Sequence, residues 1–191
     1  MLPVNFVMPY FFYHNIHNAV LISVAALARP LYHNDGTAAM TFGGLGFSYA
    51  AQLVRAFKDG GLAVNVDGNI ADDSWAASSW KEGSQTKLQC LKPDFDSPFP
   101  EIPAIEIAHA AFRHALSNES ALSRRVTLDY TEEQVFFITA CFTLCSIPSL
   151  AGRFFGGDCN KLAMNYEPFA EAFRCHDDAR MKPKNPCSFF D

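Results

Sequence analysis

The stretch "GFSYAAQLVRAFKDGG", residues 46–61, decides the fold of this chain. Its apolar positions belong to a pattern that runs over residues 37–58 and repeats about once per helical turn. The residues that recur every four positions are Leu45, Tyr49, Leu53 and Phe57. Glycines at positions 43, 44, 46 and 60 lower helix stability but allow close packing against a neighbouring element. The pattern therefore predicts one long core helix over residues 37–58.

The composition is unusually apolar for a soluble domain. Of the 191 residues, 49% are hydrophobic, 18% are charged and 18 are phenylalanine. A chain of this length forms one core, or the second half of a larger one. The apolar excess indicates either a face packed against sequence outside this chain or a membrane contact. No stretch reaches the roughly twenty uninterrupted apolar residues of a spanning helix, so the first interpretation is favoured.

Charge and the amino-terminal sequence limit the partners and the route of export. The formal net charge is −5 and the lysines and arginines form no stripe, so no nucleic-acid partner is expected. The first residues, "MLPVNFVMPYFFYHNIH", lack the basic start and small-residue cleavage site of a secretory signal. A secreted product would therefore have to arise from a longer precursor.

Six cysteines occur without a C-x-x-C pair, so a structural zinc site is not expected. Their even number favours disulfides in an oxidising compartment over free thiols. Cys141 and Cys145 are four apart on an expected helix, which would place both thiols on one face. The triplet that begins at Asn118 is an acceptor for N-glycosylation and supports an extracellular location.

The rest of the chain is expected to be mainly helical. Prolines and β-branched residues predict extended segments at residues 3–9 and 19–25, the second of them buried. Further helices are expected at residues 72–91, at 104–116, from Thr131 onward and at 167–175. The helix at Thr131 begins with a capping box, in which the side chains of Thr131 and Gln134 each bond the other's backbone. The proline-rich residues 92–103 are expected to be irregular.

Five segments, in order along the chain, carry a resemblance to a known family. They are "VNF" (4–6), "FGGLG" (42–46), "FKDGGLAVNVDGNIADDSW" (57–75), "YTEEQVFFITACFTLC" (130–145) and "EPFAEAFRC…MKPKNPCSFF" (167–190). Together they resemble the carboxy-terminal catalytic portion of the neprilysin and endothelin-converting-enzyme family of zinc metallopeptidases. The resemblance implies one peptidase domain over residues 1–191, incomplete because its amino-terminal lobe is absent. It also implies a mainly α (α+β) fold, a thermolysin-like helical catalytic half with a small edge sheet near the amino terminus.

The catalytic residues of that family are replaced in this chain. In the family's H-E-x-x-H segment, two histidines bind zinc and the glutamate takes a proton from the zinc-bound water. The resemblance places Ala51 at the first ligand, Gln52 at the general base and Arg55 at the second ligand. Alanine has no donor atom, a glutamine amide accepts no proton at neutral pH, and an arginine would repel the ion.

The remaining positions of the site follow from the register around "IEIAHAAF", residues 105–112. Counting back from this segment, the resemblance places Ser97 at the third zinc ligand and Glu101 at an aspartate that supports the ligands of the metal in the family. The segment "GNIAD", residues 68–72, looks like the family's ligand segment but lies too close to Arg55 in sequence. Ser149 matches the histidine that stabilises the transition state. No catalytic residue is therefore intact, and no zinc cofactor is predicted.

Two further expectations concern polar residues of this site. We expect Arg55 to face a cleft and to pair with Glu101, because a buried guanidinium without a partner is costly. Asn5 matches the family's substrate-contacting asparagine, although Phe6 and Pro9 weaken peptide binding at that strand edge.

The histidine pairs do not predict a relocated metal site. His14 and His17 are three apart, His109 and His114 are five apart, and neither pair forms a recognisable site with a nearby carboxylate. These histidines are expected to be solvated or to cap helices.

The disulfide expectations come from the resemblance, which implies a bond between Cys90 and Cys187. The family partners of Cys145 and Cys175 lie outside this chain. Either the chain is a fragment, or these two cysteines pair with Cys141, with Cys159 or with each other.

The sequence therefore predicts a non-catalytic member of the family. In this interpretation the protein is extracellular or at the cell surface, does not hydrolyse peptides, and binds peptides or a protein partner. Two alternatives stay open: an active zinc metalloendopeptidase that cleaves peptides, or an inactive truncated fragment that lacks the amino-terminal lobe of its parent.

Overall fold

The computed structural model describes residues 11–65, 67–70, 82–83, 86–87, 89, 100–116, 122–144, 159–182, 184 and 188–190. In these residues the chain is mainly helical with one two-stranded antiparallel sheet, which confirms the predicted fold class. None of the helices described is long and apolar enough to cross a membrane. The segments expected at residues 3–9 and 72–91 lie wholly or largely outside the described residues, as does most of 92–103.

The sheet is a hairpin of β1 (Phe11–His14) and β2 (Ala19–Ile22). In its register Phe12 lies opposite Leu21, and both side chains are exposed, whereas Phe11 is buried. The extended structure predicted for residues 19–25 is therefore correct for its first part, but its burial is wrong. Among the described residues, other elements cover only one face of this two-stranded sheet. After the sheet, residues Val24–Leu27 form a 3₁₀ helix.

The decisive stretch lies in one continuous helical rod. It comprises α1 (Ala38–Thr41), a π-helical segment (Phe42–Gly46), α2 (Phe47–Val54) and a 3₁₀ turn (Arg55–Phe57). The helix predicted over residues 37–58 is thus confirmed. Its buried face is different from the predicted stripe: Phe47, Ala50 and Val54 are buried, whereas Tyr49 and Phe57 are exposed.

Two glycines of the π-helical segment allow the rod to approach its neighbours closely. A β-carbon at Gly43 would lie 2.4 Å from the carbonyl oxygen of Phe136, and one at Gly44 would lie 2.4 Å from that of Leu31. Only glycine permits such contact without a shift of backbone, which confirms the predicted close packing. A short helix, α3 (Asp59–Leu62), follows the rod.

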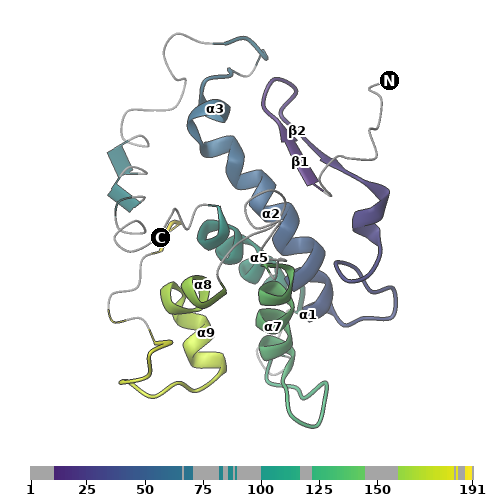
Figure 1. The fold of residues 1–191 in the computed structure, drawn as a ribbon, viewed down its shortest axis with the longest axis vertical. Helices are drawn as coiled ribbons and strands as arrows, with labels where there is room; N and C mark the ends of the chain where they lie inside the picture. The colour runs from purple at the N-terminus through teal and green to yellow at the C-terminus, as the bar shows by residue number, and fades with distance from the viewer. Residues whose placement is uncertain are drawn as a thin grey trace, which may run out of the picture.

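The helix α5 (Glu101–Leu116) packs along α2 and supplies the second layer of the core (Figure 1). Ile105, Ala108 and Phe112 are buried on its inner face, as the sequence predicted. The helix begins at Glu101, three residues before the predicted start. Pro103 does not prevent this, because the first turn of a helix needs no backbone N–H from that residue.

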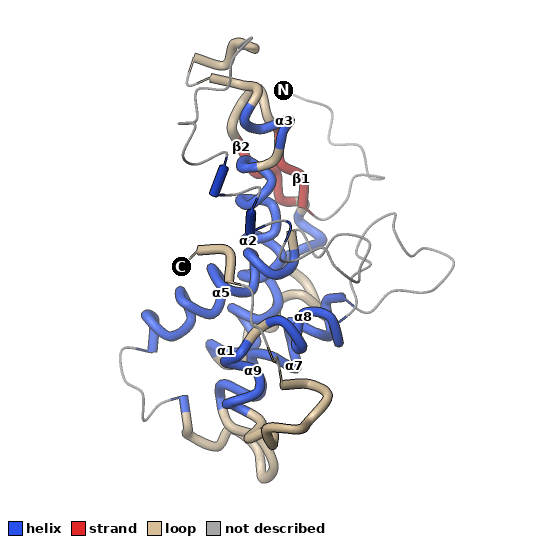
Figure 2. Tube along the Cα trace, turned by 90° about the vertical axis from the view of Figure 1, so that its left-hand side faces the viewer, coloured by secondary structure: helices blue, strands red, loops and turns tan. Residues whose placement is uncertain are grey.

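Three further helices complete the core: α7 (Glu132–Leu144), α8 (Cys159–Asn165) and α9 (Glu167–Ala172). The helix α7 packs on α1 and the π-helical segment, α8 packs on α5, and α9 packs on α7. The Thr131 N–H donates to Gln134 Oε1 at 3.0 Å and the Gln134 N–H donates to Thr131 Oγ1 at 3.3 Å, so the predicted capping box is confirmed. The predicted short helix around α9 is also present, whereas the sequence predicted no helix at α8. Figures 1 and 2 place the hairpin and α3 toward one end of the molecule, and α7 and α9 toward the other.

Candidate functional site

The candidate site is the carboxy-terminal part of α2 together with the start of α5. Ala51 is half-buried, and the Gln52 side chain is buried with 7% of its surface exposed. Arg55 is exposed at the first residue of the 3₁₀ turn, where its backbone is still helical. The backbone therefore keeps positions 51 and 55 one helical turn apart, as an H-x-x-x-H pair of ligands would require.

The side chains present do not fit a zinc ion. A methyl group at Ala51 offers no lone pair, and the guanidinium of Arg55 carries a fixed positive charge. The carboxamide of Gln52 cannot serve as the general base. Within the described residues no group of three or more His, Cys, Asp or Glu side chains is arranged to hold a metal ion. The expected positions Ser97 and Ser149 lie outside those residues.

Glu101 lies at the start of α5 with its Oε2 atom buried and without a hydrogen-bond partner. Burial raises the pKa of this carboxyl, and the nearby positive charges of Arg55 and Lys161 partly oppose the increase. Arg55 itself is exposed, and the described residues include no direct ion pair between it and Glu101. The predicted buried pair is therefore wrong. The long arginine side chain reaches solvent and acts on Glu101 only across a distance.

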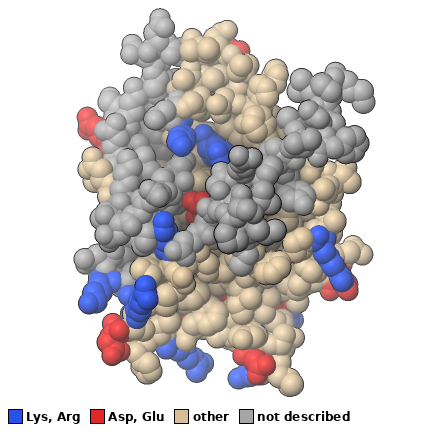
Figure 3. Space-filling view, viewed as in Figure 1, with Lys and Arg blue, Asp and Glu red and all other residues tan. Residues whose placement is uncertain are grey.

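The charged side chains of the surrounding surface are dispersed. On the face seen in Figure 3, basic and acidic side chains are interspersed, and the described part of this face has no continuous basic patch.

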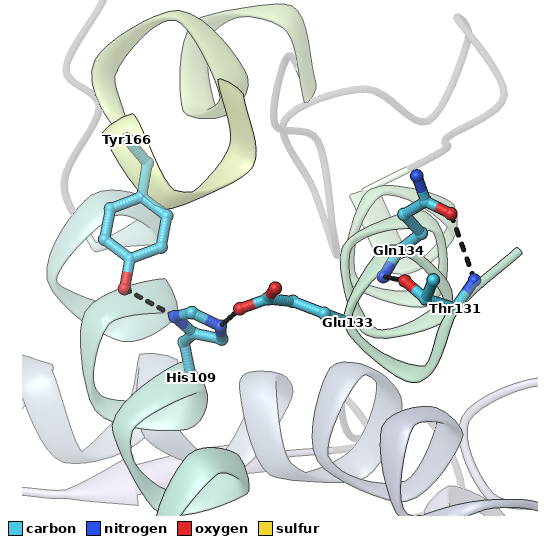
Figure 4. Close-up of polar contacts among 5 residues, drawn as sticks. All are labelled: His109, Thr131, Glu133, Gln134 and Tyr166. Atoms are coloured by element: carbon cyan, nitrogen blue, oxygen red, sulfur yellow. Dashed lines mark hydrogen bonds and ion pairs between the residues drawn. The ribbon is translucent and has the colours of Figure 1, made fainter. Parts of the chain in front are cut away.

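A buried polar cluster joins the helices behind this site (Figure 4). His109 of α5 is 2% exposed; its Nδ1 lies 3.0 Å from the hydroxyl of Tyr166, and its Nε2 lies 3.0 Å from Oε1 of Glu133. The ring also packs 5.1 Å from Phe136 and 5.0 Å from Phe137, measured between ring centroids. The expectation that His109 is solvated or caps a helix is therefore wrong. This histidine bonds α5 to α7 and to the residue that precedes α9.

Further polar contacts fix the same helices. Arg124 Nη2 lies 2.8 Å from Oε1 of Glu132, a side chain that is 1% exposed. The backbone N–H groups of Phe189 and Phe190 donate to the two carboxylate oxygens of Glu106 at 2.8 and 3.0 Å. The carboxy-terminal segment is therefore attached to α5.

A disulfide between Cys141 and Cys159 joins α7 to α8. The possible pairing of Cys145 or Cys175 with Cys141 or Cys159 is therefore wrong, because Cys141 and Cys159 bond to each other. Cys175 forms no disulfide among the described residues. Several predicted features lie outside the described residues. They are the bond between Cys90 and Cys187, the cysteine at 145, the glycosylation acceptor Asn118 and the substrate contact Asn5.

The sequence analysis missed the His109 cluster, although part of its signal was present. His109 occupies the apolar side of its helix, one residue after Ala108 and three before Phe112. A histidine among buried positions needs polar partners. The partners come from residues 24 and 57 positions away along the chain, which no local pattern identifies.

Comparisons with known proteins give the class of fold first. Over 95% of this chain, the structure superposes with a TM-score of 0.73 on 32% of the Mycobacterium tuberculosis zinc metalloprotease Zmp1 in complex with inhibitor, at 20% identity. It also superposes with a TM-score of 0.74 on 35% of a chain of the Haemonchus galactose-containing glycoprotein complex, at 19% identity and 95% coverage of this chain. The fold is thus that of a portion of these larger proteins.

The sequence comparisons then give the family. The profile of peptidase family M13 matches residues 11–101. Human endothelin-converting enzyme 1 is 22% identical over 207 aligned residues, which cover 92% of this chain and 26% of the enzyme. Together these findings show that the chain is similar to the neprilysin family of M13 peptidases, in agreement with the resemblance in its sequence. The chain spans about a quarter of the length of the curated relatives it matches, and Asn5 precedes the matched range.

Proposed function

We propose that this chain is a non-catalytic member of the neprilysin-like metalloendopeptidases, which neither holds zinc nor hydrolyses peptides. The observation that carries the proposal is the side-chain set on α2. Ala51, Gln52 and Arg55 occupy one turn of a regular helix and provide neither a metal ligand nor a base.

The buried environment of Glu101 supports the same proposal. Zinc would place a double positive charge close to the start of α5, where a nearby carboxylate is normally ionised. In this chain burial raises the pKa of Glu101, and a hydrogen bond from its own backbone and the positive charges of Arg55 and Lys161 oppose the increase. In a zinc site a carboxylate beside the metal usually accepts a hydrogen bond from a ligand imidazole, whereas Oε2 of Glu101 is buried without a hydrogen-bond partner among the described residues.

A non-hydrolysing member retains binding as its activity. The partner is a peptide or another protein, and a separate amino-terminal lobe is a further candidate because the relatives are about four times longer. We place the protein outside the cell or at its surface, since the Cys141–Cys159 disulfide suits an oxidising compartment. The acceptor at Asn118 suits the same location.

Two alternatives remain for the test. Similarity to endothelin-converting enzyme 1 favours an active zinc endopeptidase, and the partial coverage of that enzyme favours an inactive fragment. The test is hydrolysis of a mixture of internally quenched peptides, with added zinc and with a chelator. An active M13 peptidase serves as the positive control.

We expect no chelator-sensitive cleavage by this chain. Cleavage that zinc restores after chelation would overturn the proposal. Circular dichroism and cooperative unfolding separate the proposed non-catalytic member from the inactive fragment, because a fragment that does not fold would show no cooperative transition.

A further inference from the structure

A pocket of about 480 Å³ is lined by residues of the β1–β2 hairpin and of the segment that follows α2. Its walls are the turn between β1 and β2, the 3₁₀ turn after α2, and residues Val64, Asn65, Asp67 and Gly68. The volume falls within the range of about 300–1,000 Å³ that is usual for small-molecule sites. Its lining does not include Ala51, Gln52 or Arg55.

Hydrogen bonds of the Asn65 side chain hold the wall that follows α3. Asn65 Oδ1 accepts hydrogen bonds from the backbone N–H groups of Asp67 and Asn69, each at 3.0 Å. Gly68 has φ of 79°, and a β-carbon there would lie 3.2 Å from the carbonyl oxygen of Ile16 in the hairpin turn. The two loops are therefore in close contact, and a ligand would meet a largely pre-organised site.

The opposite wall is held in a similar way. The Tyr13 hydroxyl donates to Asn18 Oδ1 at 2.8 Å, and the backbone N–H of Asn18 donates to the carbonyl of Asn15. These bonds fix the carboxamides so that the NH₂ groups of Asn18 and Asn65 remain as donors. Asn15 provides a further carboxamide, and Asp67 provides acceptors.

The charge and the apolar part of the lining narrow the class of ligand. Among the described residues that line the pocket, Asp67 is the one acidic side chain and none is lysine or arginine. The lining also includes the imidazole of His17, but it offers no fixed positive charge to an anionic ligand, and Asp67 disfavours one. Phe57 and Val64 add an apolar surface, on which the C–H face of a sugar ring can pack.

We propose that this pocket binds a neutral saccharide. Saccharide hydroxyls both donate and accept hydrogen bonds, so they match a lining that combines carboxamide donors with a carboxylate acceptor. The ring supplies the apolar face that meets Phe57. The proposal is independent of the hydrolytic function and stands whether or not the α2 site holds zinc.

The test uses the full chain and a set of small saccharides as probes. Saturation-transfer NMR and titrations are run with methyl α-mannoside, N-acetylglucosamine and lactose, and with glucuronate and N-acetylneuraminic acid as anionic probes. Asn15→Ala and Asp67→Ala remove exposed side chains whose backbone contacts survive substitution. Asp129→Ala, an exposed aspartate in another loop, is the matched control.

We expect at least one neutral saccharide to bind, and the anionic probes to bind at least about tenfold more weakly. Each pocket variant should weaken binding by at least about tenfold, since it removes a hydrogen-bonding group, and Asp129→Ala should change nothing. Absence of binding by all neutral probes would overturn the proposal. Binding that both pocket variants leave unchanged, in proteins with unaltered circular dichroism, would overturn it too.

Discussion

The end of α2 and the cluster around His109 differ in what their side chains contribute. At the end of α2 the backbone is a regular helix, yet the side chains at positions 51, 52 and 55 lack the groups that zinc hydrolysis needs. At His109 the polar groups are buried and bonded on both ring nitrogens. The comparison teaches that this fold is stabilised by contacts in which metal chemistry has no part.

The difference has a simple energetic basis. A buried polar group that loses its partner costs about 1–3 kcal/mol, so replacing a member of the His109 cluster destabilises the fold. Replacing a metal ligand by alanine on a helix removes only an interaction with the ion. Loss of the zinc site is therefore compatible with a stable helical core, whereas loss of the cluster is not.

The largest effect is expected for His109→Ala. The change removes a buried ring from between aromatic side chains and both hydrogen bonds to Glu133 and Tyr166. The free energy of unfolding should fall by about 3–5 kcal/mol, measured by urea denaturation. His109→Phe keeps a ring and should recover part of this loss.

The control for this pair is His176→Ala, at an exposed position after α9, which should change the free energy of unfolding by less than about 0.5 kcal/mol. A loss below about 1 kcal/mol for His109→Ala would mean that the cluster does not hold α5, α7 and the start of α9 together.

A smaller effect is expected from glycines of the π-helical segment. Gly43→Ala would push a β-carbon to 2.4 Å from the carbonyl of Phe136 and should cost about 1–3 kcal/mol. Gly46→Ala meets its nearest atoms at 3.5 Å, which is ordinary contact, and should be neutral or add up to about 1 kcal/mol. Thermal unfolding of the two variants measures both. Equal effects in the two variants would show that the rod does not rest directly on α7.

The smallest effect concerns Glu101 and depends on pH. Because burial raises the pKa of this carboxyl above its ordinary value of 4.5, the folded state binds the proton more tightly than the unfolded state. The stability that this preference provides is complete below pH 4.5 and is lost as the pH rises through the pKa of the folded state. Glu101→Gln should therefore stabilise the protein at pH 7 and have no effect below pH 4.5.

Unfolding curves at several pH values measure this difference, with Glu171→Gln on the exposed side of α9 as the control. Destabilisation by Glu101→Gln at pH 7 would mean that the ionised carboxylate has a partner, as a direct pair with Arg55 would provide.

Local signals in the sequence predicted much of the fold. The long rod, the capping box at Thr131 and the inner face of α5 each follow from spacing within one helix. The sequence did not predict which face of the rod is buried, because its glycines and small residues allow neighbouring elements to pack on more than one side. The helix α8 was missed because its seven residues carry too short a pattern.

The candidate site at the end of α2 was also predictable in part from local sequence. The identities at positions 51, 52 and 55 can be read directly, and a helix fixes their spacing. The distance from Arg55 to Glu101 cannot be read, because it depends on where an exposed arginine side chain extends. The contacts of His109 with Glu133 and Tyr166 join three helices, so only the tertiary structure reveals them.

The most direct test of the central claim is a zinc titration of the chain beside the double variant Ala51→His, Arg55→His. Two imidazoles one turn apart on the α2 backbone provide a minimal metal site, so the variant should bind zinc measurably by calorimetry. The parent chain should show no saturable binding at the same concentrations, and its metal content after dialysis should be far below one zinc per chain. Stoichiometric zinc in the parent chain, retained on dialysis, would contradict the account.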